Sequence, residues 1–374
     1  MRRHVRLRRL TSTTTPDRAV IGLALPSSAA DPIHDVRTGV TMTRLGNMHG
    51  PDFTYLGVPK ADLDDESTYS DADVVIIGAP FDGGTGHRSG CRMGPMAIRG
   101  CDYLPHDGSR PHLSLRVDPL RELKIVDVGD VLMPAGDTEK SLERIGEAVR
   151  KVCAAGAVPV CIGGDHTIAL ADITGVARHH GWGRVSVVHF DAHADTGDII
   201  HGELVGHGTP MRRLLESGAC RGDRFLQLGL RGYWPEPETL EWMARQGMRC
   251  FEMAEIVDRG LDDVLTEASR IALDDCDGVF ISVDIDVVDP GMAPGTGTPE
   301  PGGFTSRQLL DSVRRLCLEL PVVGVEVVEV SPPYDHADIT AALGNRVVLE
   351  ALSAIAARRR GEPVNPARPL LEGR

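Results

Sequence analysis

Residues 185–195 read Val-Ser-Val-Val-His-Phe-Asp-Ala-His-Ala-Asp. The apolar, β-branched first half predicts a buried strand, which stops at a cluster of ionisable side chains. Asp191, His193 and Asp195 stand at alternate positions, and alternate positions of extended backbone share one face, so two carboxylates and an imidazole converge. Such a cluster is costly beside a buried strand unless a positive charge lies within it. The stretch therefore predicts a divalent metal ion.

Outward from this strand, apolar runs alternate with amphipathic segments. We expect further strands over Ala72–Pro80, Lys124–Asp127, Val158–Ile162, Phe225–Leu230, Gly278–Val283 and Val322–Val328. We expect helices from near Pro95 and over Thr138–Ala155, Thr167–His180, Pro210–Ser217, Glu236–Gln246, Leu261–Asp274, Thr305–Leu320 and Asp338–Ala357. Strands rich in Val and Ile, each followed by a helix, predict an α/β fold with a parallel sheet covered by helices on both faces.

This alternation occupies residues 71–358, and no linker rich in Pro, Gly or Ser divides it, so we expect one domain there. Residues 1–70 lack periodicity and are expected to be a disordered leader followed by an irregular arm, and residues 359–374 a basic C-terminal tail. The N-terminus resembles a signal peptide, but polar residues separate its basic and apolar regions. We therefore expect a leader or an early start codon rather than export. Met42 and Met48 are alternative starts, and whether the residues before Met42 belong to the native protein stays open.

Composition narrows the classes of function. The 374 residues include 54 Asp and Glu against 40 Lys and Arg, a formal net charge of −14. This balance argues against nucleic acid and anionic membranes as partners. The eight cysteines form no C-x-x-C pair, as expected of reduced thiols in a cytoplasmic protein. No segment approaches the ~20 apolar residues that span a bilayer.

Polar clusters follow three more predicted strands at their ends. They are Gly163-Gly164-Asp165-His166, Ser282-Val283-Asp284-Ile285-Asp286 and Glu329-Val330-Ser331-Pro332. Each cluster alone is also compatible with a turn, a helix cap or a solvated acid. In open α/β sheets, however, sites lie at the carboxyl ends of strands. The four clusters together therefore predict one site at that edge of the sheet.

The site offers more ligands than one ion needs: His166, Asp191, His193, Asp195, Asp284 and Asp286. A single zinc takes about three protein ligands and a water, so this set is too large for it. It suits two divalent ions bridged by carboxylates. Oxygen-rich ligation with some imidazole favours Mn²⁺ first, with Ni²⁺, Co²⁺ or Fe²⁺ as alternatives. Two ions that share one water would lower its pKa and supply a nucleophile at neutral pH.

The four clusters, in this order and over residues 73–357, resemble those of the ureohydrolase family of arginases, agmatinases and guanidinobutyrases. The resemblance implies a three-layer α/β/α sandwich and a binuclear Mn²⁺ centre that cleaves a guanidino compound to urea and an amine. It implies that one ion is held by His166, Asp191, Asp195 and Asp284. It implies that the other is held by Asp191, His193, Asp284 and Asp286, with Asp191 and Asp284 bridging.

The resemblance also implies two catalytic residues beside the bridging Asp191. A guanidinium is a poor electrophile and must be oriented by a carboxylate, and Glu329 matches the family residue in that role. His207 matches the histidine that protonates the leaving amine. His201 has no such match and is expected to be a loop residue that lines the site.

Two loops bear on which guanidino compound binds. Residues 196–203 lack the arginase pattern, which argues against L-arginine. Residues 83–95 resemble the agmatinase loop and are expected to gate the substrate; we call them the gating loop. They depart from the usual form at His87, Ser89 and Met93.

The charge on the tail of the substrate stays open. A cationic tail, as in agmatine, would pair with Asp198 or Glu203, and a carboxylate tail, as in 4-guanidinobutyrate, with His87, Arg88 or Arg92. Agmatinase, in polyamine biosynthesis, is the first expectation. Guanidinobutyrase, or another hydrolase of guanidino acids or guanidine derivatives, is the alternative.

One alternative is of another class, a non-catalytic, ureohydrolase-like accessory subunit. Degraded ligands would mark such a subunit, and none of the six is degraded. The same fold includes formiminoglutamate hydrolases and single-zinc deacetylases, and the deacetylases keep only part of the ligand set. The resemblance further implies a homo-oligomer, a trimer or hexamer, whose partner is a small guanidino substrate.

Overall fold

The computed structural model describes residues 33–34, 41–42, 54–103 and 108–361. Two short strands, β1 (Ile33–His34) and β2 (Thr41–Met42), pair antiparallel in a unit of their own. The described residues from 54 onward form a second, compact unit around one large sheet. The expected leader and C-terminal tail lie mostly outside the described residues.

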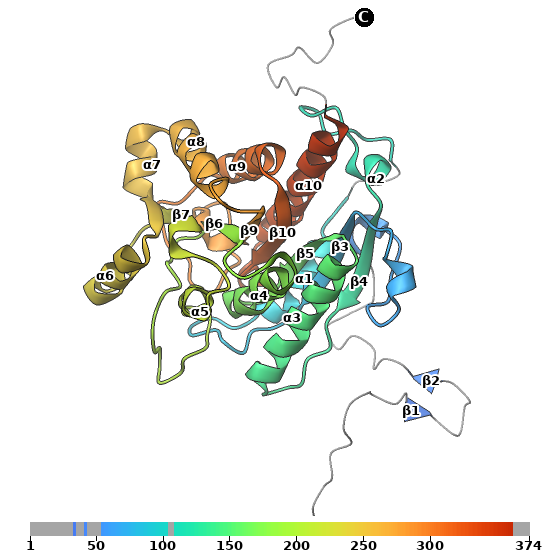
Figure 1. Cartoon of the computed structure of the whole chain (residues 1–374), viewed down its shortest axis with the longest axis horizontal. Helices are drawn as coiled ribbons and strands as arrows, with labels where there is room; N and C mark the ends of the chain where they lie inside the picture. Colours follow the sequence, from blue (N-terminus) through green and yellow to red (C-terminus); the bar gives the residue numbers. More distant parts are fainter. Residues whose placement is uncertain (1–32, 35–40, 43–53, 104–107, 362–374) are drawn as a thin grey trace, which may run out of the picture. The chain divides into compact units, whose positions relative to one another are not determined.

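All eight strands of the large sheet run parallel, in the order β4-β3-β5-β10-β9-β6-β7-β8 (Figure 1). They are β3 (Val74–Ala79), β4 (Ile125–Asp130), β5 (Val158–Gly163), β6 (Val185–Phe190), β7 (Phe225–Leu230), β8 (Arg249–Glu252), β9 (Gly278–Asp284) and β10 (Val322–Val328). The central strands are buried on both faces, which explains their continuous Val and Ile runs. The predicted parallel sheet is confirmed.

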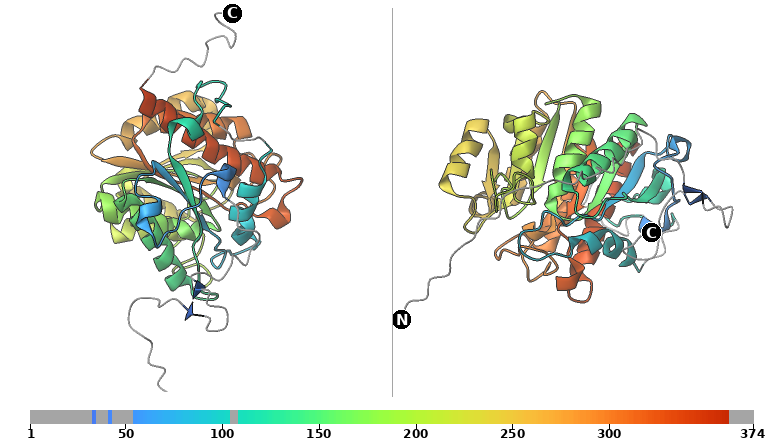
Figure 2. Two further views of the ribbon diagram at one scale, coloured as in Figure 1. Left: turned by 90° about the vertical axis from the view of Figure 1, so that its right-hand side faces the viewer. Right: turned by 90° about the horizontal axis from the view of Figure 1, so that it is seen from below.

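Helices cover both faces of this sheet, as the two views in Figure 2 show. One hydrophobic core lies under α3 (Thr138–Ala154), α4 (Ala169–His180) and α5 (Pro210–Ser217). The core on the other face lies under α1 (Gly94–Gly100), α7 (Met253–Arg259), α8 (Leu261–Ala272), α9 (Ser306–Glu319) and α10 (Ile339–Arg360). Neighbouring strand residues such as Ile76 and Ile77 of β3 enter different cores. The predicted three-layer sandwich is therefore confirmed.

The remaining elements lie at the margins. Helix α2 (Pro119–Glu122) packs against α10, and α6 (Pro237–Gln246) contributes Met243 to a small apolar cluster with Leu230. The arm before β3 is held by Tyr55, which is fully buried and donates through its hydroxyl to the Asn345 carbonyl of α10 at 2.8 Å.

Five of these elements were not predicted from the sequence: β1, β2, β8, α2 and α7. Strand β8 reads Arg-Cys-Phe-Glu, and only Phe251 is buried, because an edge strand needs little apolar surface. Helix α10 also continues to Arg360, past the expected end at Ala357, so the expected start of the tail at 359 falls inside it.

Helix α10 is the one helix within residues 54–103 and 108–361 that is long and apolar enough to cross a membrane. The sequence analysis anticipated no such segment. The most apolar window of α10 has a mean hydropathy of 1.4, and 72% of it is buried inside the fold, where it contacts α9, α1 and α2. Burial in the core accounts for its composition.

Candidate active site

The polar clusters lie at the carboxyl ends of four adjacent strands in the middle of the sheet, β5, β10, β9 and β6. In-register pairing aligns these ends: Val327 of β10 pairs with Ile162 of β5 and with Val283 of β9, and Val283 pairs with Phe190 of β6. The segments that follow these strands therefore begin side by side at one edge of the sheet. Segments separated by more than a hundred positions in sequence come together there, where the sequence places the site.

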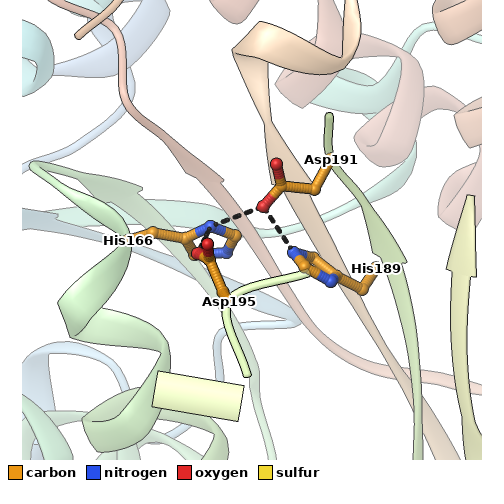
Figure 3. A group of neighbouring side chains, drawn as sticks. All are labelled: His166, His189, Asp191 and Asp195. Atoms are coloured by element: carbon orange, nitrogen blue, oxygen red, sulfur yellow. Dashed lines mark hydrogen bonds and ion pairs between the residues drawn. The ribbon is translucent and has the colours of Figure 1, made fainter. Parts of the chain in front are cut away.

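His166 is the centre of the first ligand group. Its buried Nδ1 atom faces carboxylate oxygens of Asp191, Asp195 and Asp284 at 3.1, 3.0 and 3.2 Å. Figure 3 shows Asp191 and Asp195 converging on this ring. None of the three contacts has hydrogen-bond geometry, so Nδ1 has no hydrogen-bond partner among the described residues. The other ring nitrogen lies 3.0 Å from the Ser282 hydroxyl. A buried nitrogen that faces three carboxylates is the donor set of a divalent cation.

Asp191, His193 and Asp286 form a second group of possible ligands, which shares Asp191 with the first. His193 Nδ1 lies 3.0 Å from Asp286 Oδ2 and 3.5 Å from Asp191 Oδ1. Asp284 joins the two groups: one oxygen faces His166, and the other accepts the backbone N–H of Asp286 at 2.8 Å. The structure thus brings all six expected ligands into two adjoining groups.

The carboxylates of the two groups repel one another. Burial and the charges on Asp286 and Asp191 raise the pKa of Asp284 well above its ordinary value. Burial also raises the pKa of Asp286, although a neighbouring imidazole opposes this. Burial opposes the charge on Asp191 too, but three surrounding imidazoles hold its pKa well below the usual range. Bound cations would relieve this excess of negative charge.

Asp195, with φ 53°, and Glu329, with φ 62°, both adopt left-handed backbone. For a residue other than glycine this costs roughly 1–3 kcal/mol. Backbone hydrogen bonds hold both in place: the Asp195 carbonyl accepts from Met211 N–H at 3.1 Å, and Glu329 N–H donates to the Gly164 carbonyl at 2.8 Å. Strain of this kind concentrates at functional sites, where it aims side chains that regular backbone would point elsewhere.

Glu329 is 1% exposed, and both its oxygens have partners. Oε1 accepts the backbone N–H of His166 at 2.9 Å and lies 3.1 Å from His207 Nδ1, and Oε2 accepts the Cys91 thiol at 3.1 Å. Burial acts to raise the pKa of Glu329, but the contact with His207 lowers it. Burial would lower the pKa of His207, but the Glu329 carboxylate raises it to about 9. The two residues form an ion pair whenever the imidazole is protonated, with Glu329 buried and His207 half-buried.

The gating loop crosses the site beside His207. Gly86 N–H donates to His207 Nε2 at 2.9 Å. A Cβ atom at Gly86 would lie 3.1 Å from that nitrogen and 3.9 Å from His201 Nε2, so both histidines lie close to this point of the loop. Asp165 anchors the loop by accepting the Gly84 N–H at 2.8 Å and the Thr85 hydroxyl at 3.2 Å. His201 thus lies at the mouth of the site.

Asp198, one of the two acids expected to pair with a cationic substrate tail, has partners elsewhere. Its oxygens pair with Arg213 at 2.8 Å and with Arg212 at 3.2 Å. The structure therefore does not bring Asp198 to the metal ligands as an unpaired acid. Glu203, the other acid, is exposed in a short hairpin that pairs it with Ile200.

The basic candidates lie along the gating loop. The Arg88 guanidinium stacks over the Tyr334 ring, 5.2 Å from its centroid. A Cβ atom at Gly297 would lie 3.2 Å from the Arg88 carbonyl oxygen and 3.3 Å from Glu329 Oε2, so this part of the loop runs beside the buried acid. His87 is exposed. Arg92 instead pairs at 2.6 Å with Asp82, which directly precedes the gating loop.

Among the residues that touch this site and that the sequence analysis missed are His189 and Cys91. His189 is fully buried, and its Nε2 lies 2.8 Å from Asp191 Oδ2 (Figure 3). His189 could have been recognised from the sequence, because it interrupts an apolar strand two positions before Asp191, on the same face. The contact of Cys91 with Glu329 joins positions 238 residues apart and has no comparable signal.

Comparisons with known proteins agree with this geometry. Residues 72–354 match the arginase family. The chain is 39% identical over 284 residues to guanidinopropionase of Pseudomonas aeruginosa, covering 76% of this chain and 86% of that protein. It is also 39% identical over 285 residues to mitochondrial agmatinase of Gallus gallus, with coverage of 76% and 81%. The solved proclavaminate amidino hydrolase of Streptomyces clavuligerus matches with a TM-score of 0.72 and 33% identity, over 84% of this chain and 100% of that one.

Proposed function

The chain belongs to the arginase family and is a hydrolase of guanidino compounds, and from this premise we propose that it releases urea from agmatine. The observation that carries the proposal is the site itself. Two groups of metal ligands share Asp191, and a buried Glu329 paired with His207 lies beside them. This combination provides both a place for cations and a carboxylate for the substrate.

The donor set fits the metal pair with which this family works. Its buried imidazole nitrogen faces three carboxylates, and burial together with neighbouring carboxylates raises the pKa values of Asp284 and Asp286. We propose two Mn²⁺ ions because four carboxylates and two imidazoles suit that ion, with Ni²⁺ or Co²⁺ as alternatives. When bound, the ions would supply Lewis-acid stabilisation and a water of lowered pKa.

Glu329 orients the substrate in this proposal. A carboxylate matches the planar, forked N–H groups of a guanidinium. Since Oε1 is already engaged by His166 and His207, Oε2 is the oxygen that the substrate reaches, in competition with the Cys91 thiol. A fixed acceptor of this kind orients the central carbon before reaction.

His207 protonates the leaving amine in this proposal. Its Nδ1 is tied to Glu329, so Nε2 is the atom that exchanges the proton. In the structure Nε2 accepts from Gly86 N–H, and two N–H groups cannot face each other. Protonation of Nε2 therefore requires the gating loop to shift, which couples loop position to the charge on His207.

A specific observation favours a second candidate substrate, a guanidino acid. Asp198 is neutralised by two arginines, whereas the Arg88 backbone runs near Glu329 and its guanidinium lies over Tyr334, with no acidic partner among the described residues. A carboxylate tail would pair with Arg88 and the exposed His87. The similarity to guanidinopropionase is in keeping with this candidate.

The proposal is tested by urea release from the Mn²⁺-loaded chain. The panel is agmatine, 4-guanidinobutyrate, 3-guanidinopropionate, arginine and guanidine. Highest kcat/KM on agmatine supports the first candidate, and highest kcat/KM on a guanidino acid supports the second. No urea from any of them, with two metals bound, would instead favour a non-catalytic subunit. We further propose a cytoplasmic homo-oligomer, which fractionation and sedimentation analysis test directly.

A further inference from the structure

Three polar side chains form a row across the sheet beside the metal ligands. His189 of β6 is the direct cross-strand neighbour of Gln227 on β7, and Gln227 is the neighbour of Cys250 on β8. The Cys250 thiol donates to Gln227 Oε1 at 3.3 Å, and Gln227 Nε2 lies 3.0 Å from His189 Nδ1. His189 Nε2 then lies 2.8 Å from Asp191 Oδ2. His189 and Gln227 are fully buried, so water does not compete for these contacts.

The orientation of the Gln227 amide follows from one backbone contact. Gln227 Nε2 lies 2.7 Å from the Ala194 carbonyl oxygen, which cannot donate, so the amide nitrogen must be at this end. The same NH₂ group faces His189 Nδ1. Two N–H groups cannot face each other, so Nδ1 accepts, and the hydrogen of the imidazole is on Nε2. His189 therefore donates to Asp191.

This tautomer decides between two roles for His189. The ring lies 4.9 Å from that of His166, close enough to group it with His166, Asp191 and Asp195 as a possible ligand. A ligand needs a free nitrogen lone pair. The lone pair of Nδ1 accepts from Gln227, and Nε2 carries a hydrogen. His189 thus acts on a ligand rather than as one.

Asp191 is the carboxylate that both ligand groups share, so its orientation affects both ions. The backbone N–H of His193 holds Oδ1 at 2.6 Å, and His189 holds Oδ2. We propose that Gln227 and His189 form a positioning relay that fixes the Asp191 carboxylate for two metal ions. This inference rests on the two-metal centre of the proposed function. Hydrogen-bond partners of metal ligands typically account for 10–100-fold in metal affinity, which sets the expected effect at about that size.

The relay is tested by Mn²⁺ binding to the full-length chain, freed of metal by chelation. Titration calorimetry gives the affinities, and the EPR spectrum of a coupled Mn²⁺ pair reports its formation. His189→Gln keeps an N–H donor near the position of Nε2, and His189→Leu fills the space without one. Gln227→Met removes the NH₂ group that sets the tautomer.

We expect His189→Leu and Gln227→Met to weaken Mn²⁺ binding by about 10–100-fold. His189→Gln should recover most of that loss. Ser186→Ala is the matched control, because Ser186 is fully buried on the same strand but on its other face, where its hydroxyl donates to the Ala272 carbonyl at 2.7 Å. It should lower the melting temperature and leave Mn²⁺ affinity unchanged.

Each other outcome overturns one part of the inference. If His189→Leu binds Mn²⁺ as tightly as the wild type does, the relay is overturned. Equal losses in His189→Gln and His189→Leu would overturn it in favour of direct ligation by His189. If His189→Leu does not fold, Gln227→Met decides by the same criterion. Fewer than two Mn²⁺ ions on the wild-type chain would instead overturn the two-metal centre, so the two failures are distinguishable.

Discussion

Replacing Glu329 by Gln removes one buried charge at nearly constant volume, and two effects should follow. The first concerns the substrate, because a neutral amide cannot form an ion pair with a guanidinium. Removing one partner of a buried ion pair costs about 3–5 kcal/mol. Since each 1.36 kcal/mol is a factor of ten in rate, kcat/KM should fall on the order of 10²–10⁴-fold. Urea release measures this loss.

The second effect concerns His207. Its pKa is about 9 because the Glu329 carboxylate outweighs burial, which acts to lower it. In Glu329→Gln burial is opposed by the smaller effects of Asp195 and Asp165, so the pKa of His207 should fall well below about 9. A pKa that is raised in the folded state adds stability below the unfolded value, and this stability is lost as pH rises through the folded value. The free energy of unfolding should therefore fall between about pH 6.5 and 9 in the wild type and less so in Glu329→Gln.

NMR titration of the His207 ring follows the pKa, and chemical denaturation at several pH values follows stability. Metal content is the control, because Glu329 belongs to neither ligand group and Glu329→Gln should bind as much Mn²⁺ as the wild type. An unchanged kcat/KM would refute the role of Glu329 in binding the substrate. An unchanged His207 titration would refute the ion pair.

Four further substitutions test other parts of the site. Asp286→Asn should abolish urea release and lower metal content while leaving circular dichroism unchanged; full activity would contradict two-metal hydrolysis. Gly86→Ala should lower kcat on the order of tenfold with metal content retained, because the added Cβ would lie 3.1 Å from His207 Nε2 and misplace the gating loop; kinetics at saturating substrate check it. Asp198→Asn should leave agmatine turnover near the wild-type value because two arginines already neutralise Asp198, and a loss of activity confined to agmatine would contradict this expectation. Arg88→Ala should lower kcat/KM on guanidino acids by about 10–100-fold if Arg88 binds their carboxylate.

The ligand set could be predicted because it depends on two regular features. Residues two apart on a strand share a face, and parallel strands end at one edge of a sheet. These rules placed Asp191, His193 and Asp195 at the correct edge, but the expected extended backbone was wrong, because all three follow the end of β6 at Phe190 and Asp195 is left-handed. The adjacency of β5, β10, β9 and β6 needed the resemblance, because strand order is set by packing between segments distant in sequence.

The features of the site that the sequence did not reveal depend on tertiary contacts. The left-handed backbone of Asp195 and Glu329 contradicts their local preference and is imposed by hydrogen bonds from Met211 and to Gly164. The pairing of Asp198 with Arg212 and Arg213 depends on how one loop packs on α5. Side chains that could bind the tail of a substrate could therefore be named from the sequence, but those that pair with each other instead could not be recognised.

The central claim is that two divalent ions on this chain act together on a guanidino substrate. The most direct test adds Mn²⁺ stepwise to metal-free protein and measures urea release from agmatine and 3-guanidinopropionate against bound Mn²⁺ per chain. The account predicts that activity reaches its maximum when both ligand groups are filled. Full activity with a single ion per chain, or urea release that does not respond to Mn²⁺, would contradict it.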